Sequence, residues 1–307
     1  MKARLIVNPK SGTDSAPDSL ETINRLLREH TGTLEIVMTV GEGDAESAAG
    51  QAVRDGVDHL FVGGGDGTLN EALNGVASVP GGLEAVTFGV IPLGTGNDFA
   101  TAQGIPEDVG QAIARLFDGE SARVDVGKMN DRYFINVSAG GFIAEVSDAV
   151  NPLLKTIAGK FAYLLGGAQV VFNYEPVRAA VHVSGTTRSL LLQTFAVCNS
   201  PLVGGGRLIA PRAVVDDGLL DACLIEAMPT VEFLALLRRL SSGEHLVDPR
   251  VTYVQTDAIE LDCDRRILVN TDGQVLEASR CAYSVGPQAA TFLGFRPGAA
   301  SLPEEAP

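Results

Sequence analysis

The first 125 residues alternate between short apolar runs and amphipathic stretches. Apolar runs of strand length occupy residues 3–7, 34–40, 59–62 and 86–92. Between and after them, hydrophobic residues recur at helical spacing, as in Leu69, Leu73 and Val76, and Ser19 is the expected N-cap of the first helix. Helices are predicted near residues 19–27, 44–54, 69–76, 98–103 and 109–117. Such alternation predicts a parallel β-sheet covered by helices, that is, an α/β domain over residues 1–125.

The pattern changes at Asp125, after which strand-like runs separated by turn residues dominate. The exceptions are helix-like stretches at residues 153–171 and 230–240. Many strands with turn signals indicate a β-sandwich or open barrel, so residues 126–295 are expected to form a β-rich domain. The last twelve residues, 296–307, are rich in Pro, Ala and Glu and are expected to form a flexible tail. Strands are predicted at residues 123–129, 133–138, 177–185, 189–198, 218–227, 251–263, 265–275 and 280–285.

Composition narrows the class of protein. With 45% hydrophobic and 20% charged residues, the chain is typical of a soluble globular protein. The net charge of -15 and the lack of a basic run argue against a nucleic-acid partner and a polybasic membrane anchor. Neither a signal-peptide pattern nor a transmembrane segment is evident, which favours a cytoplasmic location.

Cysteine and histidine spacing predicts no metal centre of its own. The cysteines lack C-x-x-C spacing, so free buried thiols are expected, and the four histidines are too scattered to favour a histidine metal site. The cysteines are Cys198, Cys223, Cys263 and Cys281.

The stretch HLFVGGGDGTLNEALNGV, residues 59–76, places four glycines around Asp66 where a strand passes into a helix. Glycine lets the backbone approach a ligand, and the free N–H groups of a helix start favour an anion. The spacing matches neither G-x-G-x-x-G nor a Walker A loop. A phosphate would repel Asp66 unless a divalent cation or a proton-transfer role accounts for that carboxylate. A metal–nucleotide site explains both groups, and a plain tight turn is the alternative.

Two further loops have the same composition at strand-to-helix junctions. They are IVNPKSG, after the first strand, and VIPLGTGNDFA, after the fourth. In a parallel sheet, loops that follow the carboxyl ends of strands lie on one edge, where ligands bind. Three such loops on one edge predict a nucleotide site. Its candidate residues are Asn8, Ser11, Gly12, Asp66, Thr68, Asn70, Thr95, Asn97 and Asp98.

In this order, NPKSG, GGGDGTLNEALNGV and PLGTGNDFA closely resemble the diacylglycerol kinase catalytic domain of soluble bacterial lipid kinases, a superfamily shared with sphingosine and ceramide kinases. The resemblance continues through RVDVGKMNDRYFINVSAGGF and GGGRLIAPRAVVDDGLLDACLI to ILVNTDGQV, and so covers nearly the whole chain. It implies an NAD kinase/diacylglycerol kinase-like fold with the active site between the two domains. The implied activity is ATP- and Mg²⁺-dependent phosphorylation of a lipid hydroxyl such as that of diacylglycerol. GGDGT alone is less specific because NAD kinases share it, which leaves an NAD kinase-like enzyme as an alternative.

The resemblance also assigns ligand-binding residues. Asp66, Asp98 and Asp125 would join the polar network around Mg²⁺ and the phosphates, and Asp217 with the Leu219 carbonyl would hold a structural Mg²⁺. Val214 supplies no side-chain oxygen to that second metal, and a plain β-turn is the alternative there. The implied ATP contacts are Asn8, Pro9, Lys10, Ser11, Gly12, Thr39, Gly64, Gly65, Asp66, Gly67, Thr68, Leu69, Asn70 and Thr95.

The chain departs from the family pattern at the general base. The family uses the glutamate of a late DGE motif, whereas this sequence has Asp272, Gly273 and Gln274, and glutamine accepts no proton at neutral pH. Ile143 also stands where aspartate is expected. Either Asp66, as in the sphingosine kinase branch, or Asp272 takes the proton, or the protein is a non-catalytic nucleotide-binding homologue.

The sequence identifies the residues that would bind a lipid less specifically than those that would bind the nucleotide. Residues 153–172 are apolar all round apart from two lysines, which fits a cover over an acyl-chain pocket or an ordinary buried helix. The acidic balance argues against strong electrostatic anchoring to anionic membranes, so peripheral contact with a lipid substrate is expected. A homodimer is left open.

Overall fold

The computed structural model describes residues 1–11, 16–149 and 174–295. Its N-terminal half is built on four parallel strands in the order β2-β1-β3-β4. The register places Leu5 between Ile36 on one side and Phe61 on the other. The parallel α/β sheet predicted from the sequence is therefore confirmed. The elements of this half are β1 (Lys2–Val7), α1 (Ala16–His30), β2 (Thr33–Met38), α2 (Asp44–Arg54), β3 (His59–Gly64), α3 (Asp66–Ala77), α4 (Gly82–Ala85), β4 (Thr87–Pro92), α5 (Asp98–Ala102) and α6 (Val109–Asp118).

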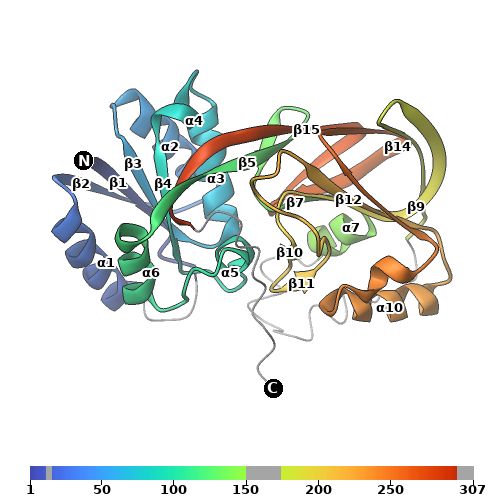
Figure 1. The fold of residues 1–307 in the computed structure, drawn as a ribbon, viewed down its shortest axis with the longest axis horizontal. Helices are drawn as coiled ribbons and strands as arrows, with labels where there is room; N and C mark the ends of the chain where they lie inside the picture. Colours follow the sequence, from blue (N-terminus) through green and yellow to red (C-terminus); the bar gives the residue numbers. More distant parts are fainter. Residues whose placement is uncertain (12–15, 150–173, 296–307) are drawn as a thin grey trace.

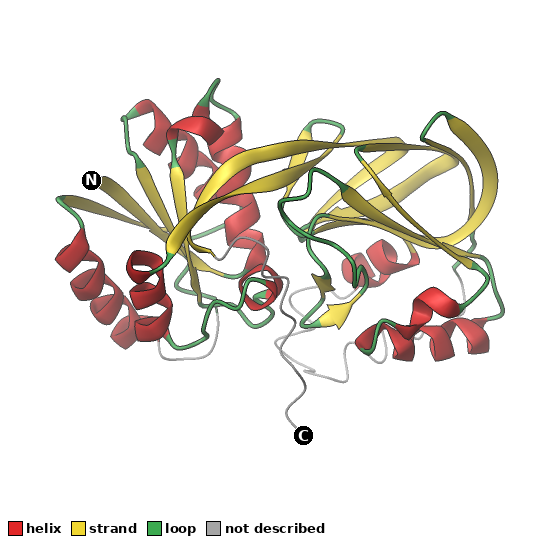
Figure 2. Ribbon diagram, viewed as in Figure 1, coloured by secondary structure: helices red, strands yellow, loops and turns green. Residues whose placement is uncertain are grey.

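Helices cover both faces of this parallel sheet (Figure 2). Successive side chains of a strand point to opposite faces, and β1 divides accordingly: Leu5 and Val7 are buried in the cluster that includes residues of α1 and α6. Ile6 is buried instead with α2 and α3. Because both faces of the sheet are buried, its strands consist of consecutive hydrophobic residues. This is why the strands could be predicted from the sequence.

The start of α1 differs from the prediction. The helix begins at Ala16, so Ser19 lies inside it and is not its N-cap. Pro17 is the second residue of the helix, where its missing N–H costs nothing because the first N–H groups of a helix have no intrahelical partner. The helix can therefore include the proline upstream of the serine.

The C-terminal half is β-rich, as predicted, and its strands pair mainly antiparallel. β9 pairs with β7, β8 and β12, while β14 pairs with β7, β8 and β15. Apolar side chains of these strands, with Phe195 and Leu261 fully buried, form the core of this half. Its elements are β5 (Glu120–Met129), β6 (Arg132–Phe134), β7 (Val137–Gly141), α7 (Phe142–Ala149), β8 (Val177–Val183), β9 (Thr186–Cys198), β10 (Leu202–Val203), β11 (Arg207–Leu208), β12 (Leu220–Glu226), α10 (Thr230–Arg238), η1 (Arg239–Ser241), η2 (Glu244–Val247), β13 (Val251–Thr256), β14 (Ala258–Thr271) and β15 (Gln274–Phe295).

One long strand joins the two halves. β15 runs for 22 residues, well past the end predicted for it at residue 285. It pairs with β14 at one end and with β4 at the other, where Thr291 lies beside Thr87, and β5 pairs antiparallel along much of its length. Figure 1 shows β5 and β15 crossing from one half to the other along the top of the molecule. The sheet is thus continuous through both halves, and a domain boundary at residue 125 remains a prediction.

Two predicted segments lie outside the described residues: the apolar stretch at 153–172 and the tail at 296–307. The helix predicted at 230–240 is present as α10 followed by η1. Within the described residues, no helix combines the length and apolar character needed to cross a membrane.

Candidate active site

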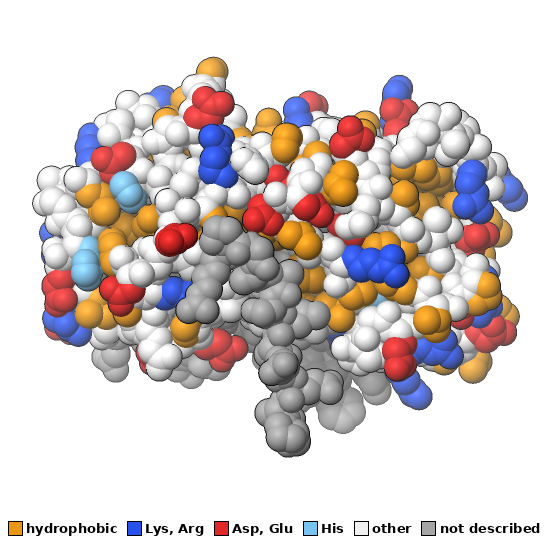
Figure 3. All heavy atoms as spheres, viewed as in Figure 1, with side chains coloured by type: hydrophobic (Ala, Val, Ile, Leu, Met, Phe, Trp, Pro, Cys, Tyr) orange, Lys and Arg blue, Asp and Glu red, His pale blue; other side chains and the backbone are white. Residues whose placement is uncertain are grey.

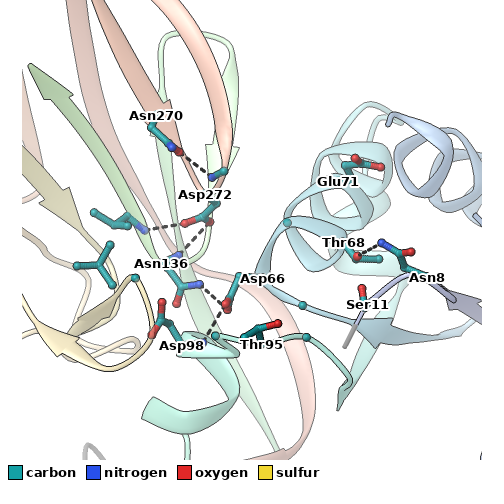
Figure 4. A pocket seen from close by; sticks show the side chains of 18 of the residues that line it. Asn8, Ser11, Asp66, Thr68, Glu71, Thr95, Asp98, Asn136, Asn270 and Asp272 are labelled. Atoms are coloured by element: carbon teal, nitrogen blue, oxygen red, sulfur yellow. Dashed lines mark hydrogen bonds between the residues drawn. The ribbon is translucent and has the colours of Figure 1, made fainter. Parts of the chain in front are cut away.

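Three strand-to-helix loops and part of the C-terminal half line one cavity of about 580 Å³. This size falls within the range usual for small-molecule sites. Figure 4 shows the groups of both halves facing the same space, with Asp66 between them. The loops after β1, β3 and β4, with the first residues of α3 and α5, supply Asn8, Lys10, Ser11, Gly65, Asp66, Gly67, Thr68, Gly94, Thr95, Gly96 and Asp98. The helix α3 adds Glu71, and the remaining lining residues are Asn136, Val137, Ala139, Ile143, Val203, Gly204, Asn270, Asp272 and Gly273.

Two of these loops approach so closely that only glycine fits where they meet. A Cβ added to Gly94 would lie 2.5 Å from the Gly65 Cα, and one added to Gly65 would lie 3.2 Å from the Gly94 Cα. Gly65 is also the N-cap of α3 and offers no side-chain oxygen to the first N–H groups of that helix. The start of α3 therefore presents N–H groups and the positive end of the helix dipole to the cavity, the arrangement that binds phosphate.

Asp66 links this helix to both neighbouring segments. Its carboxylate accepts hydrogen bonds from the Asp98 and Phe99 backbone N–H groups, at 2.9 and 3.0 Å. The Asn136 Nδ2 donates a third, at 3.0 Å. Asp66 is half-buried and remains part of the cavity wall, so the fold fixes its position without removing it from the site.

Asp98 is a second carboxylate on the same wall, only 7% exposed. It accepts hydrogen bonds from the backbone N–H groups of Gly205 and Gly206, the shortest at 2.7 Å. Burial raises the pKa of Asp98 and the nearby Asp66 carboxylate adds to the shift, while the two glycine N–H groups oppose it. Two carboxylates this close favour a cation between or beside them.

Asp272 is the third carboxylate at the cavity, and it is almost wholly enclosed, with 7% of its surface exposed. The N–H groups of Ile135, Asn136 and Val137 donate to it at 2.7, 3.1 and 2.8 Å. Asn70 Nδ2 adds a bond of 3.2 Å. Burial raises the pKa of Asp272 to about 6, against these hydrogen bonds, which favour the ionised form.

Gln274 does not line the cavity. Asp272 and Gly273 form the turn of the β14–β15 hairpin, both with positive φ, and Thr271 pairs with Gln274 across it. The Gln274 Oε1 accepts a hydrogen bond from Arg132, whose guanidinium also forms a two-bond pair with Glu46 at 3.0 and 2.8 Å. The turn thus sends the side chains of 272 and 274 to different surroundings.

Several predicted nucleotide contacts have side chains that contact other parts of the protein, and their assignment to the nucleotide stays a prediction. Leu69 is in the hydrophobic core, and Asn70 bonds Asp272 and the Tyr133 carbonyl. Asn97 lies in the left-handed region and closes its own loop through Gly94. Pro9, Thr39 and Gly64 do not line the cavity, and Gly12 lies outside the described residues.

Three of the predicted metal residues lie together outside the cavity lining: Asp125, Asp217 and Leu219. The Asp125 carboxylate accepts hydrogen bonds from the Gly218 and Gln288 N–H groups at 2.6 and 2.5 Å, and does not line the cavity. Asp217 Oδ1 accepts from the Leu219 N–H at 3.0 Å. Burial raises the pKa of both aspartates, and their mutual repulsion adds to the shift at Asp217. A cation at this turn would relieve that repulsion, and the assignment stays a prediction.

Sequence reasoning missed one polar group of the cavity above all, Asn136. It lies in the run YFINVS, where it interrupts an otherwise apolar strand pattern, and that interruption was the available signal. The apolar wall formed by Val137, Ala139 and Val203 carries no signal of its own, because such residues look like core.

A separate group of potential metal-ligand atoms lies on β8 and β14, away from the cavity. His182, Glu260 and Asp262 bring ligand atoms within 4.8 Å of one another. The Arg280 guanidinium already pairs with both carboxylates, at 2.8 and 3.8 Å. The cysteines are free, three of them buried and Cys263 half-buried.

Comparison with known proteins extends these observations. Residues 2–129 match the family model of the diacylglycerol kinase catalytic domain, and residues 136–294 match that of the YegS C-terminal NAD kinase beta sandwich-like domain. A diacylglycerol kinase from Staphylococcus carnosus is 33% identical over 275 residues, covering 89% of this chain and 88% of that protein. One from Bacillus subtilis is 31% identical, covering 89% of each chain.

Solved structures agree with the sequence comparisons. The crystal structure of a diacylglycerol kinase from Bacillus anthracis superposes with a TM-score of 0.79 at 26% identity, covering 96% of this chain and 97% of that one. Sequence and fold match over both halves of the molecule, and the cavity lies where those halves meet. The chain therefore belongs to the diacylglycerol kinase catalytic-domain family of lipid kinases.

Proposed function

We propose that the protein transfers the γ-phosphate of ATP, in a Mg²⁺-dependent reaction, to the hydroxyl group of diacylglycerol or a related lipid. The observation that carries this proposal is the composition of one cavity. It combines a helix start suited to phosphate, the carboxylates of Asp66, Asp98 and Asp272, and an apolar wall from the C-terminal half. NAD kinase-like chemistry would need a polar second substrate, which the apolar wall does not favour.

The nucleotide side of the proposal rests on the loops of the N-terminal half. Gly67 and Thr68 lie in the first turn of α3, and Lys10 is the one cation among the described residues that line the cavity. Ser11 and Thr95 add hydroxyl donors. Phosphoryl transfer depends mostly on positioning and charge neutralisation, and these groups supply both.

Mg²⁺ would be held beside Asp66 and Asp98, whose carboxylate oxygens are ligands that this ion prefers. When bound, it would neutralise charge on the phosphates and hold them in line with the acceptor hydroxyl. The residues of the chain fix the two carboxylates through backbone N–H groups, so they do not need to rearrange on binding.

The lipid side is the wall of Val137, Ala139, Ile143 and Val203. Ile143, which stands where aspartate was expected, adds apolar surface there. A lipid acceptor would be taken from a membrane surface by peripheral contact of a cytoplasmic enzyme. On the face shown in Figure 3, Lys and Arg side chains are dispersed, so this contact would depend on apolar surface more than on charge. A homodimer remains a prediction.

The reaction converts ATP and a lipid hydroxyl into ADP, a lipid phosphate and one proton, so a group must accept that proton. We propose Asp66 for this role because it is half-buried and faces the cavity. Asp272 is nearly enclosed and accepts four hydrogen bonds, which suits a residue that holds the segment 135–137 in place.

The test is transfer of radiolabelled phosphate from ATP to diacylglycerol and to a panel of other lipids, with NAD as a further acceptor. Asp66→Asn should lower transfer by about 10²–10⁴-fold, because a general base typically contributes that much. Asp131→Asn, at an exposed position outside the cavity, is the matched control and should leave transfer unchanged. Full activity in Asp66→Asn would overturn the assignment of the base.

The loss of the family's glutamate supports a second candidate, a nucleotide-binding protein without turnover. Gln274 is bonded to Arg132 and lies outside the cavity lining, so nothing at that position replaces the base. Binding of ATP without phosphorylation of any acceptor in the panel would favour this candidate over the kinase.

A further inference from the structure

Asn136 has a buried oxygen that the protein leaves unpaired. Its side chain is only 3% exposed, and its Oδ1 accepts no hydrogen bond from any described residue. Burying an amide oxygen without a partner is unfavourable, so such groups are rare in folded proteins. Asn136 is also one of the residues that line the cavity, so its side chain borders the space that a ligand would occupy.

The orientation of this amide follows from its neighbours. Asn136 Nδ2 lies 3.0 Å from Asp66 Oδ1, and only the NH₂ end of the amide can face a carboxylate. The backbone N–H of the same residue donates to Asp272, and its carbonyl accepts from the N–H groups of Asn199 and Ser200. With the backbone fixed at both ends, the side chain has no freedom to turn its Oδ1 towards another protein donor.

The surroundings of the unpaired oxygen are rich in negative charge. Figure 4 shows the Asn136 amide between the carboxylates of Asp66 and Asp98. Asp66 Oδ2 accepts a single hydrogen bond, from the Asp98 N–H, and so keeps lone-pair capacity towards the cavity. An anion would be repelled here, whereas a hard divalent cation takes its ligands from carboxylate and amide oxygens alike.

We propose that Asn136 is a ligand of the divalent cation in this site, its Oδ1 acting together with the Asp66 carboxylate while its Nδ2 holds that carboxylate in place. The proposal rests on the kinase function proposed above and adds to it the residue that completes the protein's share of the cation site. One side chain then both positions a neighbouring ligand and supplies one of its own.

The experiment measures the affinity of the folded full-length chain for Mn²⁺, a paramagnetic substitute for Mg²⁺, by electron paramagnetic resonance with a non-hydrolysable ATP analogue present. Asn136→Ala removes the oxygen and should weaken Mn²⁺ binding by about tenfold or more. Asn136→Asp keeps an oxygen at the same place and loses the donor to Asp66, and it should bind Mn²⁺ at least as well as the parent chain. Asn136→Leu, which preserves volume, replaces the alanine variant if that variant does not fold.

Asn199→Ala is the matched control. Asn199 is 1% exposed and also has a buried Oδ1 without a partner, but it does not line the cavity. Its loss should lower the melting temperature and leave Mn²⁺ affinity unchanged. Parental Mn²⁺ affinity in folded Asn136→Ala, or equal weakening in Asn136→Ala and Asn136→Asp, would overturn the ligand role alone. Failure of the parent chain to bind Mn²⁺ with the analogue would overturn the kinase proposal as well.

Discussion

Asp272 illustrates at the level of one residue how burial and hydrogen bonding compete. Removal from water raises its pKa to about 6, although four donors face its carboxylate. In the unfolded chain an aspartate titrates near about 3.9. The folded state therefore binds this proton more tightly than the unfolded state does.

A pH dependence of stability follows from that difference. Because the folded pKa is raised, the contribution of Asp272 is fully present below about pH 4 and is lost as pH rises through about 6. Between these limits, the parent chain should lose about 1–3 kcal/mol of unfolding free energy relative to Asp272→Asn. Urea unfolding of both proteins at intervals from pH 4 to pH 7 measures it. A difference between them that stays constant over this range would contradict the raised pKa.

Gln274 is the position where sequence comparison and structure lead to different expectations. Replacing it by glutamate restores the family's motif, but the new carboxylate would face Arg132, which already bonds Gln274 and Glu46. We expect Gln274→Glu to change the rate of lipid phosphorylation by less than about tenfold, since a base must reach the hydroxyl it deprotonates. The measurement is the radiolabel assay, with Asp66→Asn run beside it. A gain of a hundredfold or more would mean that residue 274 reaches the substrate and that the natural chain lacks its base.

At the scale of one element, the helix α3 contains two glycines with opposite surroundings. A Cβ at Gly67 would meet nothing within 4 Å and would project at the cavity lining, whereas a Cβ at Gly75 would lie 2.0 Å from the Glu46 carbonyl oxygen of α2. The first glycine leaves room for a ligand, and the second lets two helices pack closely.

The same substitution should therefore have opposite effects at these two sites. Gly67→Ala should raise stability by up to about 1 kcal/mol, because alanine favours a helix, and should weaken ATP binding because the methyl group occupies phosphate space. Gly75→Ala should lower stability by about 1–3 kcal/mol or more through overpacking. Thermal melts and calorimetric titration with ATP measure both. Gly41→Ala, open and outside the cavity, serves as the control. Unchanged ATP affinity in Gly67→Ala would show that the phosphates do not bind at the start of α3.

Helices and strands could be predicted from the sequence where the local pattern of apolar residues matches the residues that are buried in the folded protein. The strands β1, β3 and β4 are apolar on both faces, and their loops carry the glycines and carboxylates that mark a ligand site. The length of β15 was not predictable, because its last residues are ordered by β4 and β5, which lie more than 160 residues earlier. Gln274 contacts Arg132, which is distant in sequence, so no local pattern predicts its surroundings. The unpaired oxygen of Asn136 likewise results from the folded arrangement of residues that are distant in sequence.

At the scale of the whole molecule, the N-terminal half is completed by residues from the end of the chain. Phe292 stacks on Phe88 with ring centroids 5.1 Å apart and contacts Phe99 at 5.2 Å. Phe295 also contacts Phe99, at 5.6 Å. Each fully buried phenylalanine contributes about 1.5–3 kcal/mol, a large share of the roughly 5–15 kcal/mol that stabilises a whole domain.

A fragment of residues 1–129, which spans the catalytic-domain match, should therefore not fold alone. It lacks the strand that pairs with β4 and β5 and exposes the apolar surface that Phe292 covers. Circular dichroism should show no cooperative melt for the fragment, in contrast to the full chain. Joining residues 286–295 to the fragment through a flexible linker should restore the transition. A cooperative melt in the unlinked fragment at the full chain's temperature would show that the first half is an autonomous domain.

The pairing of Thr291 with Thr87 also bears on synthesis of the protein in the cell. Chains usually fold N-terminal domain first as they leave the ribosome. Here the sheet that supports the loops of the cavity gains its last strand only after β15 has emerged. Until β15 is made, the nascent protein must keep an incomplete sheet edge from associating with other chains, and the cavity between the two halves is not yet complete.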